Sequence, residues 1–151
     1  MSDAATVIAI HVAEVESGPV HAVDSVEAVA GAGLRGDRYF EPGAKPAEQL
    51  TLIESEELEA LAANAGIELA PGESRRQLTT RGVRLNPLVG RRFRVGDVEC
   101  LGIELCEPCS HLQKLTAREG LMRAFAHKAG LNAEILSGGE IAVGAIIEPL
   151  D

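Results

Sequence analysis

The hydrophobic positions of the chain fall into many short runs, most of them bounded by glycine, proline or asparagine. Residues 98–105 form an apolar run, which lies between Gly96-Asp97 and Pro108. A short run rich in Val, Ile and Leu with such boundaries predicts a buried strand. Similar patterns predict an extended segment with an irregular middle over residues 20–30. They also predict strands over residues 7–15, 49–54, 75–79, 92–95, 133–137 and 145–150.

Two stretches have helical rather than alternating periodicity. The first helix is predicted to begin with Ser55 as its N-cap and to end near Gly66, because serine caps helix starts and glycine ends them. The second follows a capping box at residues 116–119 and is predicted to end at Gly130. The expected buried faces consist of Leu58, Leu61, Ala62 and Ala65 in the first helix and Leu121, Met122, Phe125 and Ala126 in the second.

The turn signals favour a mainly β fold. Gly96-Asp97 and Gly138-Gly139 each predict a hairpin turn, and 86–90 predicts a turn or short helical segment. Many short strands with only two helices indicate a sandwich or a closed or partly open β-barrel decorated by a few short helices. With 151 residues, the chain is expected to form a single domain, residues 1–151.

Composition and charge exclude several partners. The formal net charge of −9 disfavours nucleic acid and anionic membrane surfaces, which both need a basic face. No apolar stretch approaches the roughly 20 residues that span a bilayer, and the first residues lack the basic region of a secretory signal. Three cysteines do not suggest a disulfide framework, so a reducing cytoplasm is the expected location.

The positive charges are unevenly distributed, because half of the fourteen Lys and Arg residues fall between positions 75 and 94. They are Arg75, Arg76, Arg81, Arg84, Arg91, Arg92 and Arg94. Arginine binds phosphate and carboxylate through its planar fork, so this segment is a candidate site for an anionic small molecule. The alternative is a set of solvated strand and loop charges. Upstream, the glycine-rich segment 31–40 brings two more arginines but lacks the spacing of a nucleotide phosphate loop.

Cys109 is the strongest candidate for chemistry, because it follows a predicted strand end and precedes His111 by two residues. A thiolate is both a nucleophile and a ligand for soft metals, and it needs a nearby positive field to form at neutral pH. The alternative is a small buried hydrophobe. His111 is expected either to orient or deprotonate Cys109 or to cap a turn.

The two other cysteines are weaker candidates for chemistry. Cys100 is expected in the core. Cys106 forms a Cys-x-x-Cys pair with Cys109, which we interpret as mostly incidental, although an oxidised pair stays open. His111 alone does not supply the second half of a zinc site.

The ordered motifs resemble the MOSC domain family, named for the C-terminal part of molybdenum-cofactor sulfurases. They are Gly33-Leu34-Arg35-Gly36-Asp37-Arg38, residues 49–53, Arg75-Arg76-Gln77-Leu78, residues 86–97, Glu107-Pro108-Cys109 and residues 138–144. The resemblance implies a barrel-like β fold and a family cysteine, here Cys109, that carries sulfur as a persulfide or binds molybdenum of a pterin cofactor.

Together, the resemblance and the arginine density lead to one functional expectation. The protein is expected to be a stand-alone small member that works as a sulfur carrier or binds molybdenum cofactor. Arg35, Arg38, Arg75, Arg76 and Arg81 are expected to hold the phosphate of the pterin or another anionic partner. Expected partners are a cysteine desulfurase or a molybdoenzyme.

Pyridoxal phosphate is expected only through a partner desulfurase, since no lysine of this chain lies in a matching context. Two alternatives remain: a non-catalytic barrel that binds an anionic small molecule, and a molybdenum-dependent reductase of N-hydroxylated compounds.

Overall fold

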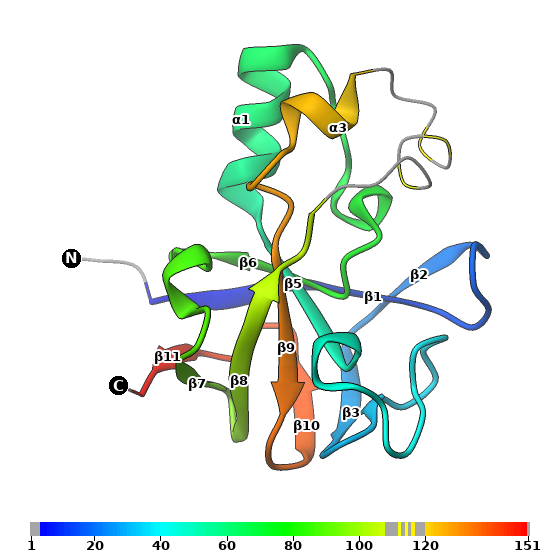
Figure 1. The fold of residues 1–151 in the computed structure, drawn as a ribbon, viewed down its shortest axis with the longest axis vertical. Helices are drawn as coiled ribbons and strands as arrows, with labels where there is room; N and C mark the ends of the chain where they lie inside the picture. The colour runs from blue at the N-terminus through cyan, green and yellow to red at the C-terminus, as the bar shows by residue number, and fades with distance from the viewer. Residues whose placement is uncertain (1–3, 108–111, 113, 115, 117–119, 151) are drawn as a thin grey trace.

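The computed structural model describes residues 4–107, 112, 114, 116 and 120–150. Its main feature is a strongly curled eight-stranded sheet in the order β11-β7-β8-β9-β5-β6-β1-β2, beside a three-stranded sheet in the order β10-β3-β4 (Figure 1). The strands are β1 (Thr6–Ala13), β2 (Val20–Val23), β3 (Ser25–Val29), β4 (Gly33–Leu34), β5 (Leu50–Glu54), β6 (Leu78–Arg81), β7 (Arg92–Val95), β8 (Val98–Leu105), β9 (Leu131–Ile135), β10 (Gly139–Ala142) and β11 (Ile147–Pro149).

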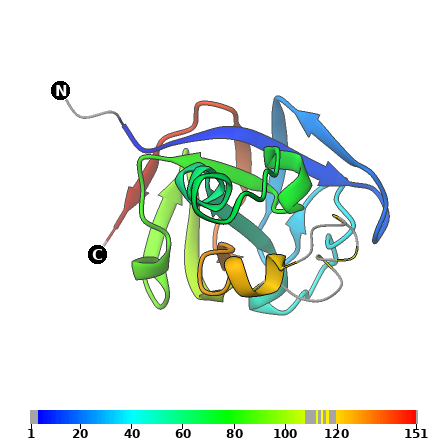
Figure 2. The same ribbon diagram turned by 90° about the horizontal axis from the view of Figure 1, so that it is seen from above.

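The helical elements are short and lie outside the sheets. The α-helices are α1 (Ser55–Ala65) and α3 (Leu121–Ala124), and the 3-10 helices are η1 (Pro46–Glu48), η2 (Pro71–Ser74) and η3 (Asn86–Leu88). Figures 1 and 2 both show α1 and α3 side by side at one end of the curled sheet. α1 connects β5 to β6, which pair in parallel, as such a crossover requires.

The large sheet curls until the start of β1 reaches the chain that enters β11. The amide of Val7 donates to the carbonyl of Ala145 at 2.9 Å, and the amide of Gly144 donates to the carbonyl of Val7 at 2.8 Å. These bonds join the two sides of the sheet at one end, while β2 extends beyond the junction as an edge. The fold is therefore mainly β and partly closed, as the sequence predicted.

Apolar side chains form two clusters. The larger lies inside the curled sheet and includes Leu50, Leu52, Phe93 and Cys100. The smaller lies under the helices, where Leu58, Leu61, Leu121 and Phe125 pack together. Because burial of such side chains is the main favourable contribution to folding, the two clusters account for how the helices stay attached to the barrel.

Several predicted elements are confirmed. Residues 98–105 form β8, and Gly96-Asp97 turns the chain back so that Val95 pairs with Val98. Gly96 has a φ of 59°, which glycine adopts without strain. The predicted extended segment 20–30 contains β2 and β3, which are separated at Asp24.

The Gly138-Gly139 prediction is wrong as a hairpin, because the strands on either side of it do not pair with each other. β9 lies between β8 and β5, whereas β10 pairs with β3 in the second sheet. A Cβ atom at Gly138 would lie 2.9 Å from the carbonyl oxygen of Ala28. Gly138 therefore permits close approach between backbones where the chain passes from one sheet to the other.

Helix boundaries also differ from the predictions. Glu54, not Ser55, occupies the N-cap position of α1, and Ala65 is exposed. α3 ends at Ala124, well before Gly130, and Met122 points outward with 41% exposure. The reversal at His127, whose φ is 62°, stops the helix from continuing.

The strand expected over residues 75–79 begins instead at Leu78, because Arg75 adopts a left-handed conformation with a φ of 63°. The first strand ends at Ala13 rather than Val15. The strands expected over residues 133–137 and 145–150 are β9, which covers residues 131–135, and β11, which covers residues 147–149.

Gly102→Ala is predicted to lower the free energy of unfolding by about 1–3 kcal/mol, the usual range for forcing extra atoms into a packed site. A Cβ atom there would lie within 2.0 Å of the carbonyl oxygen of Leu88, which is backbone and has little freedom to move. Gly139→Ala is the matched control, because its Cβ would meet only a Val98 methyl at 3.3 Å. Urea unfolding curves of both variants test the difference, and equal stabilities would contradict it.

The pH dependence of stability is predicted to include a contribution from His11. Burial lowers the pKa of His11, whose Nδ1 is buried without a hydrogen-bond partner among the described residues. The imidazole of His11 binds a proton more readily in the unfolded chain than in the folded one. The free energy of unfolding is therefore unaffected by His11 above the usual histidine pKa and falls as the pH decreases through about 6.5.

His11→Phe should therefore make the stability of the protein less dependent on pH between about 7 and 5. Denaturant midpoints at the two pH values measure this effect. His21→Phe, at an exposed position on the neighbouring strand, is the control. The same pH dependence in wild type and His11→Phe would show that His11 contributes nothing.

Candidate functional site

A cavity of about 400 Å³ lies against the outer face of the large sheet. Thr51 of β5 and Asn132 of β9 are directly paired across the sheet and both line it. Their neighbours Leu50 and Leu52 point into the core, so the alternation of β5 places Thr51 on the opposite face. The full lining is Arg38, Tyr39, Ala47, Glu48, Thr51, Arg75, Arg76, Cys106, Leu112 and Asn132. We call this space the arginine cavity.

Asp37 holds one wall of the arginine cavity in place. Its buried carboxylate accepts hydrogen bonds from the amide of Ala13 at 3.0 Å, from Arg38 at 2.9 Å and from the side-chain amide of Gln77 at 2.7 Å. The carbonyl oxygen of the Gln77 side chain in turn accepts from the amide of Thr51 at 2.9 Å. This network joins the 35–40 turn to β1, β5 and the segment before β6.

Arg38, which this network positions, forms part of the cavity wall together with Arg75. The Arg38 side chain is only 5% exposed, and its Nη2 donates to the carbonyl of Arg75 at 3.3 Å. Nη2 of Arg75 is buried and has no hydrogen-bond partner among the described residues. Burial and then the nearby charge of Arg38 lower the pKa of Arg75. A buried donor that lacks a partner costs free energy, so an acceptor that reached this atom would remove that cost.

Arg76 is tied to backbone oxygens rather than to an acid. Its Nε donates to the carbonyl of Ala129 at 2.8 Å, and its two terminal nitrogens donate to the carbonyls of Ser74 and Cys106 at 3.4 and 3.3 Å. Within the described part of the chain, no carboxylate pairs with Arg75 or Arg76. The charge of Arg38 is balanced by Asp37, whereas only exposed Glu48 opposes the other two charges in the lining.

Arg35 and Arg81 do not line the arginine cavity. Arg35 is exposed, pairs with Glu27 at 2.8 Å and lies over the ring of Phe40. Arg81 is exposed on β6 and pairs with Glu59. The remaining arginines of residues 84–94 are exposed as well, so the density of arginine in the sequence reflects one pair in the cavity and several solvated charges.

Cys106 lines the arginine cavity and is partly buried. Its amide donates to the carbonyl of Gly130 at 2.8 Å, which fixes the chain just beyond β8. Cys109 and His111 lie outside the described residues. Cys100 is buried in the core as expected, and burial raises its pKa to about 12, so it is an inert thiol.

Glu107, like Cys106, anchors the chain just beyond β8. Its carboxylate accepts from the amide of His127 at 2.6 Å and lies 2.7 Å from the ring Nδ1 of the same residue. The hydrogen bond from the His127 amide holds the pKa of Glu107 below its usual range. Two consecutive residues, Cys106 and Glu107, are therefore fixed to the loop 127–130 immediately before the Cys109 segment.

No functional role was predicted from the sequence for four polar residues of the site, Asp37, Gln77, Thr51 and Asn132. Asp37 stands next to Arg38 in the sequence, and Gln77 stands next to Arg76. A polar residue beside a candidate arginine was the signal that could have identified them. Thr51 and Asn132 carried a weaker one, as polar positions within otherwise apolar strands.

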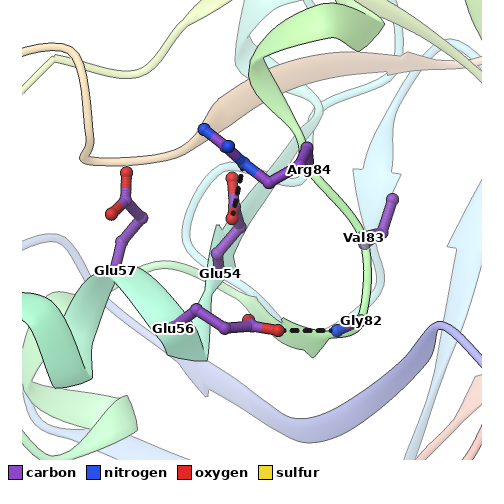
Figure 3. A pocket seen from close by; sticks show the side chains of 6 residues that line it. All are labelled: Glu54, Glu56, Glu57, Gly82, Val83 and Arg84. Carbon is purple, nitrogen blue, oxygen red and sulfur yellow. Dashed lines mark hydrogen bonds and ion pairs between the residues drawn. The ribbon is translucent and has the colours of Figure 1, made fainter. Parts of the chain in front are cut away.

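A second cavity of about 310 Å³ lies at the start of α1 and is lined mainly by acids (Figure 3). Glu54 pairs with Arg84 at 3.4 Å and accepts from the amide of Leu85 at 3.0 Å, and Glu56 accepts from the amide of Gly82 at 2.8 Å. Burial raises the pKa of Glu54. Because these carboxylates already bind the 82–85 loop, they fasten it to α1. Among the described residues, no group of three His, Cys, Asp or Glu side chains is arranged to hold a metal ion.

Residues 35–148 match the model of the MOSC domain, and the chain belongs to this family. The search of curated proteins finds no match. The fold is similar to that of YuaD from Bacillus subtilis, with a TM-score of 0.85, 16% identity, and coverage of 97% of this chain and 96% of that one.

YiiM from Geobacillus stearothermophilus aligns with a TM-score of 0.77, 18% identity and coverage of 97% and 75% of the two chains. YiiM from Escherichia coli aligns with a TM-score of 0.70, 19% identity and coverage of 100% and 70%. At these identities the similarity establishes the fold. No helix in the described ranges is long and apolar enough to cross a membrane.

Arg75→Met is predicted to weaken the binding of inorganic phosphate at least about 10-fold, because a charge-assisted hydrogen bond to an anion is worth about 1.5–3 kcal/mol. Isothermal titration calorimetry at low ionic strength measures the affinity. Arg35→Met is the matched control, since it removes the same charge outside the cavity. A larger loss in Arg35→Met than in Arg75→Met would place the anion elsewhere.

Proposed function

We propose that this MOSC-domain protein binds the phosphate of an anionic cofactor, the molybdenum cofactor, in the arginine cavity and uses Cys109 as the thiolate that carries sulfur or binds molybdenum. The buried, unpartnered Nη2 of Arg75 is the observation that carries this proposal. It supports a ligand that brings its own acceptor, and phosphate oxygens can accept two parallel hydrogen bonds from a guanidinium.

The residues of the arginine cavity fit such a group. Arg75 would bind the phosphate directly, and Arg76 would add a positive field while its backbone contacts hold it in place. Arg38, already neutralised by Asp37, would position Arg75 through the carbonyl of Arg75. Thr51 and Asn132 add polar groups on the sheet face. When bound, the cofactor supplies a molybdenum centre, for which a soft thiolate is a suitable ligand.

Cys109 is assigned the thiol role on its place in the sequence. It follows Cys106 by three residues and precedes Leu112 by three, and both of these line the arginine cavity. Three residues span at most about 11 Å, and on this basis we take Cys109 to lie near the cavity. The positive field of Arg75 and Arg76 would favour the thiolate form. Under this proposal His111 orients or deprotonates the thiol.

The sulfur-carrier step is a simple exchange. The Cys109 thiolate attacks the outer sulfur of a persulfide on a partner cysteine desulfurase, whose own cysteine leaves as a thiolate. One sulfur–sulfur bond breaks and one forms, so no separate oxidant is needed. The pyridoxal phosphate that generates the first persulfide belongs to the partner.

Incubation with a cysteine desulfurase and free cysteine is predicted to add about 32 Da, the mass of one sulfur atom, to Cys109. Peptide mass spectrometry without reductant locates the adduct. Cys109→Ser should abolish it, whereas Cys100→Ser should retain it because that thiol is buried. An adduct that persists in Cys109→Ser would refute the carrier role.

A non-catalytic anion-binding barrel is the second candidate, because the described contacts of Arg38 and Arg76 are with Asp37 and with backbone carbonyls, which positions the arginines without a thiol. The same variants separate the two functions. If Cys109→Ser binds phosphate normally and wild type acquires no sulfur, the protein is a binding module. Sulfur acquisition by wild type alone favours the carrier.

A further inference from the structure

Tyr39 stands out at the rim of the arginine cavity. It is the sole tyrosine in a chain without tryptophan, and its side chain belongs to neither hydrophobic cluster. It is 43% exposed and lines the cavity. Tyrosine is often partly exposed, so what distinguishes Tyr39 is its place in the lining of the cavity, where an aromatic ring can contact a ligand.

The ring is held in a fixed orientation. The guanidinium carbon of Arg38 lies 4.4 Å from the ring centre, within the range of a cation–π contact. Arg38 is itself fixed by Asp37, whose second carboxylate oxygen accepts from the amide of Tyr39 at 3.2 Å. Both the backbone and the ring of Tyr39 are therefore positioned by the same buried carboxylate, before any ligand binds.

This arrangement places a flat, pre-oriented surface beside two charges that have no carboxylate partner in the described part of the chain, Arg75 and Arg76. The cavity of about 400 Å³ falls within the usual range for small-molecule sites. Its lining thus combines an anion-binding part with an aromatic surface, which together match a ligand having a phosphate at one end and a planar ring at the other.

We propose that Tyr39 is a specificity-determining residue, whose ring stacks on the planar heteroaromatic part of a phosphate ester bound by Arg75 and Arg76. The proposal rests on the proposed function, because it assumes that the arginine cavity binds the phosphate. It adds that the ring system, as well as the charge, is recognised. Stacking of a base on an aromatic side chain is worth about 1–3 kcal/mol, or roughly 5- to 150-fold in affinity.

The test compares three probes by isothermal titration calorimetry: inorganic phosphate, ribose 5-phosphate and 6-hydroxymethylpterin phosphate. The wild type is expected to bind the pterin phosphate at least about 5-fold more tightly than ribose 5-phosphate. Tyr39→Leu should remove this advantage while phosphate affinity stays within about 2-fold, and Tyr39→Phe should retain it. Tyrosine emission offers a second readout, because all of it comes from Tyr39.

The outcomes separate this inference from the proposed function. If phosphate binds but Tyr39→Leu keeps the full preference for the pterin phosphate, Tyr39 does not determine specificity. If wild type binds phosphate and shows no preference for the aromatic ester, the stacking role is also wrong, although the anion site stands. If none of the three probes binds, the anion site fails and the stacking role fails with it. Unchanged phosphate affinity in Tyr39→Leu shows that the variant is folded.

Discussion

The buried carboxylate of Asp37 is the interaction on which the candidate site depends. It accepts hydrogen bonds from β1, from Arg38, from the amide of Tyr39 and from Gln77. A charge removed from water is costly unless paired and fully hydrogen-bonded, and here four donors meet that requirement. The same bonds fix the 35–40 turn against the sheet, so the cost of burying one carboxylate is offset by contacts that shape the cavity.

Because Asp37 balances the charge of Arg38, the positive charge of the arginine cavity comes from Arg75 and Arg76. Arg75 and Arg76 follow each other in the chain, yet they have different tasks. Arg76 is buried and bound to backbone carbonyls from three segments, which makes it part of the framework. Arg75 adopts the left-handed conformation, and its Nη2 lies buried without an acceptor from the described residues. Arg76 therefore holds this segment in place, while Arg75 carries a buried donor that has no acceptor among the described residues.

Local signals in the sequence were enough for most elements but not for the site. The strand over residues 98–105, the Gly96-Asp97 turn and the end of α1 at Gly66 depend on neighbours in the chain, and they were predicted. Pairing of β10 with β3 joins residues more than a hundred positions apart, so the local Gly138-Gly139 signal misled. Likewise, arginine density predicted a shared site for Arg81, which instead pairs with Glu59 on the surface.

The contrast between the cysteines shows what the fold adds to a thiol. Cys100 faces the core, where loss of water raises its pKa to about 12 and makes it inert. Cys106, just past the same strand, lies in the arginine cavity, and its carbonyl accepts from Arg76. Together with the Glu107–His127 contact, this fixes the chain on a rigid frame immediately before the Cys109 segment. Of the two described thiols, Cys106 is therefore the one that lies beside the positive charges of Arg75 and Arg76, whereas Cys100 is separated from them in the core.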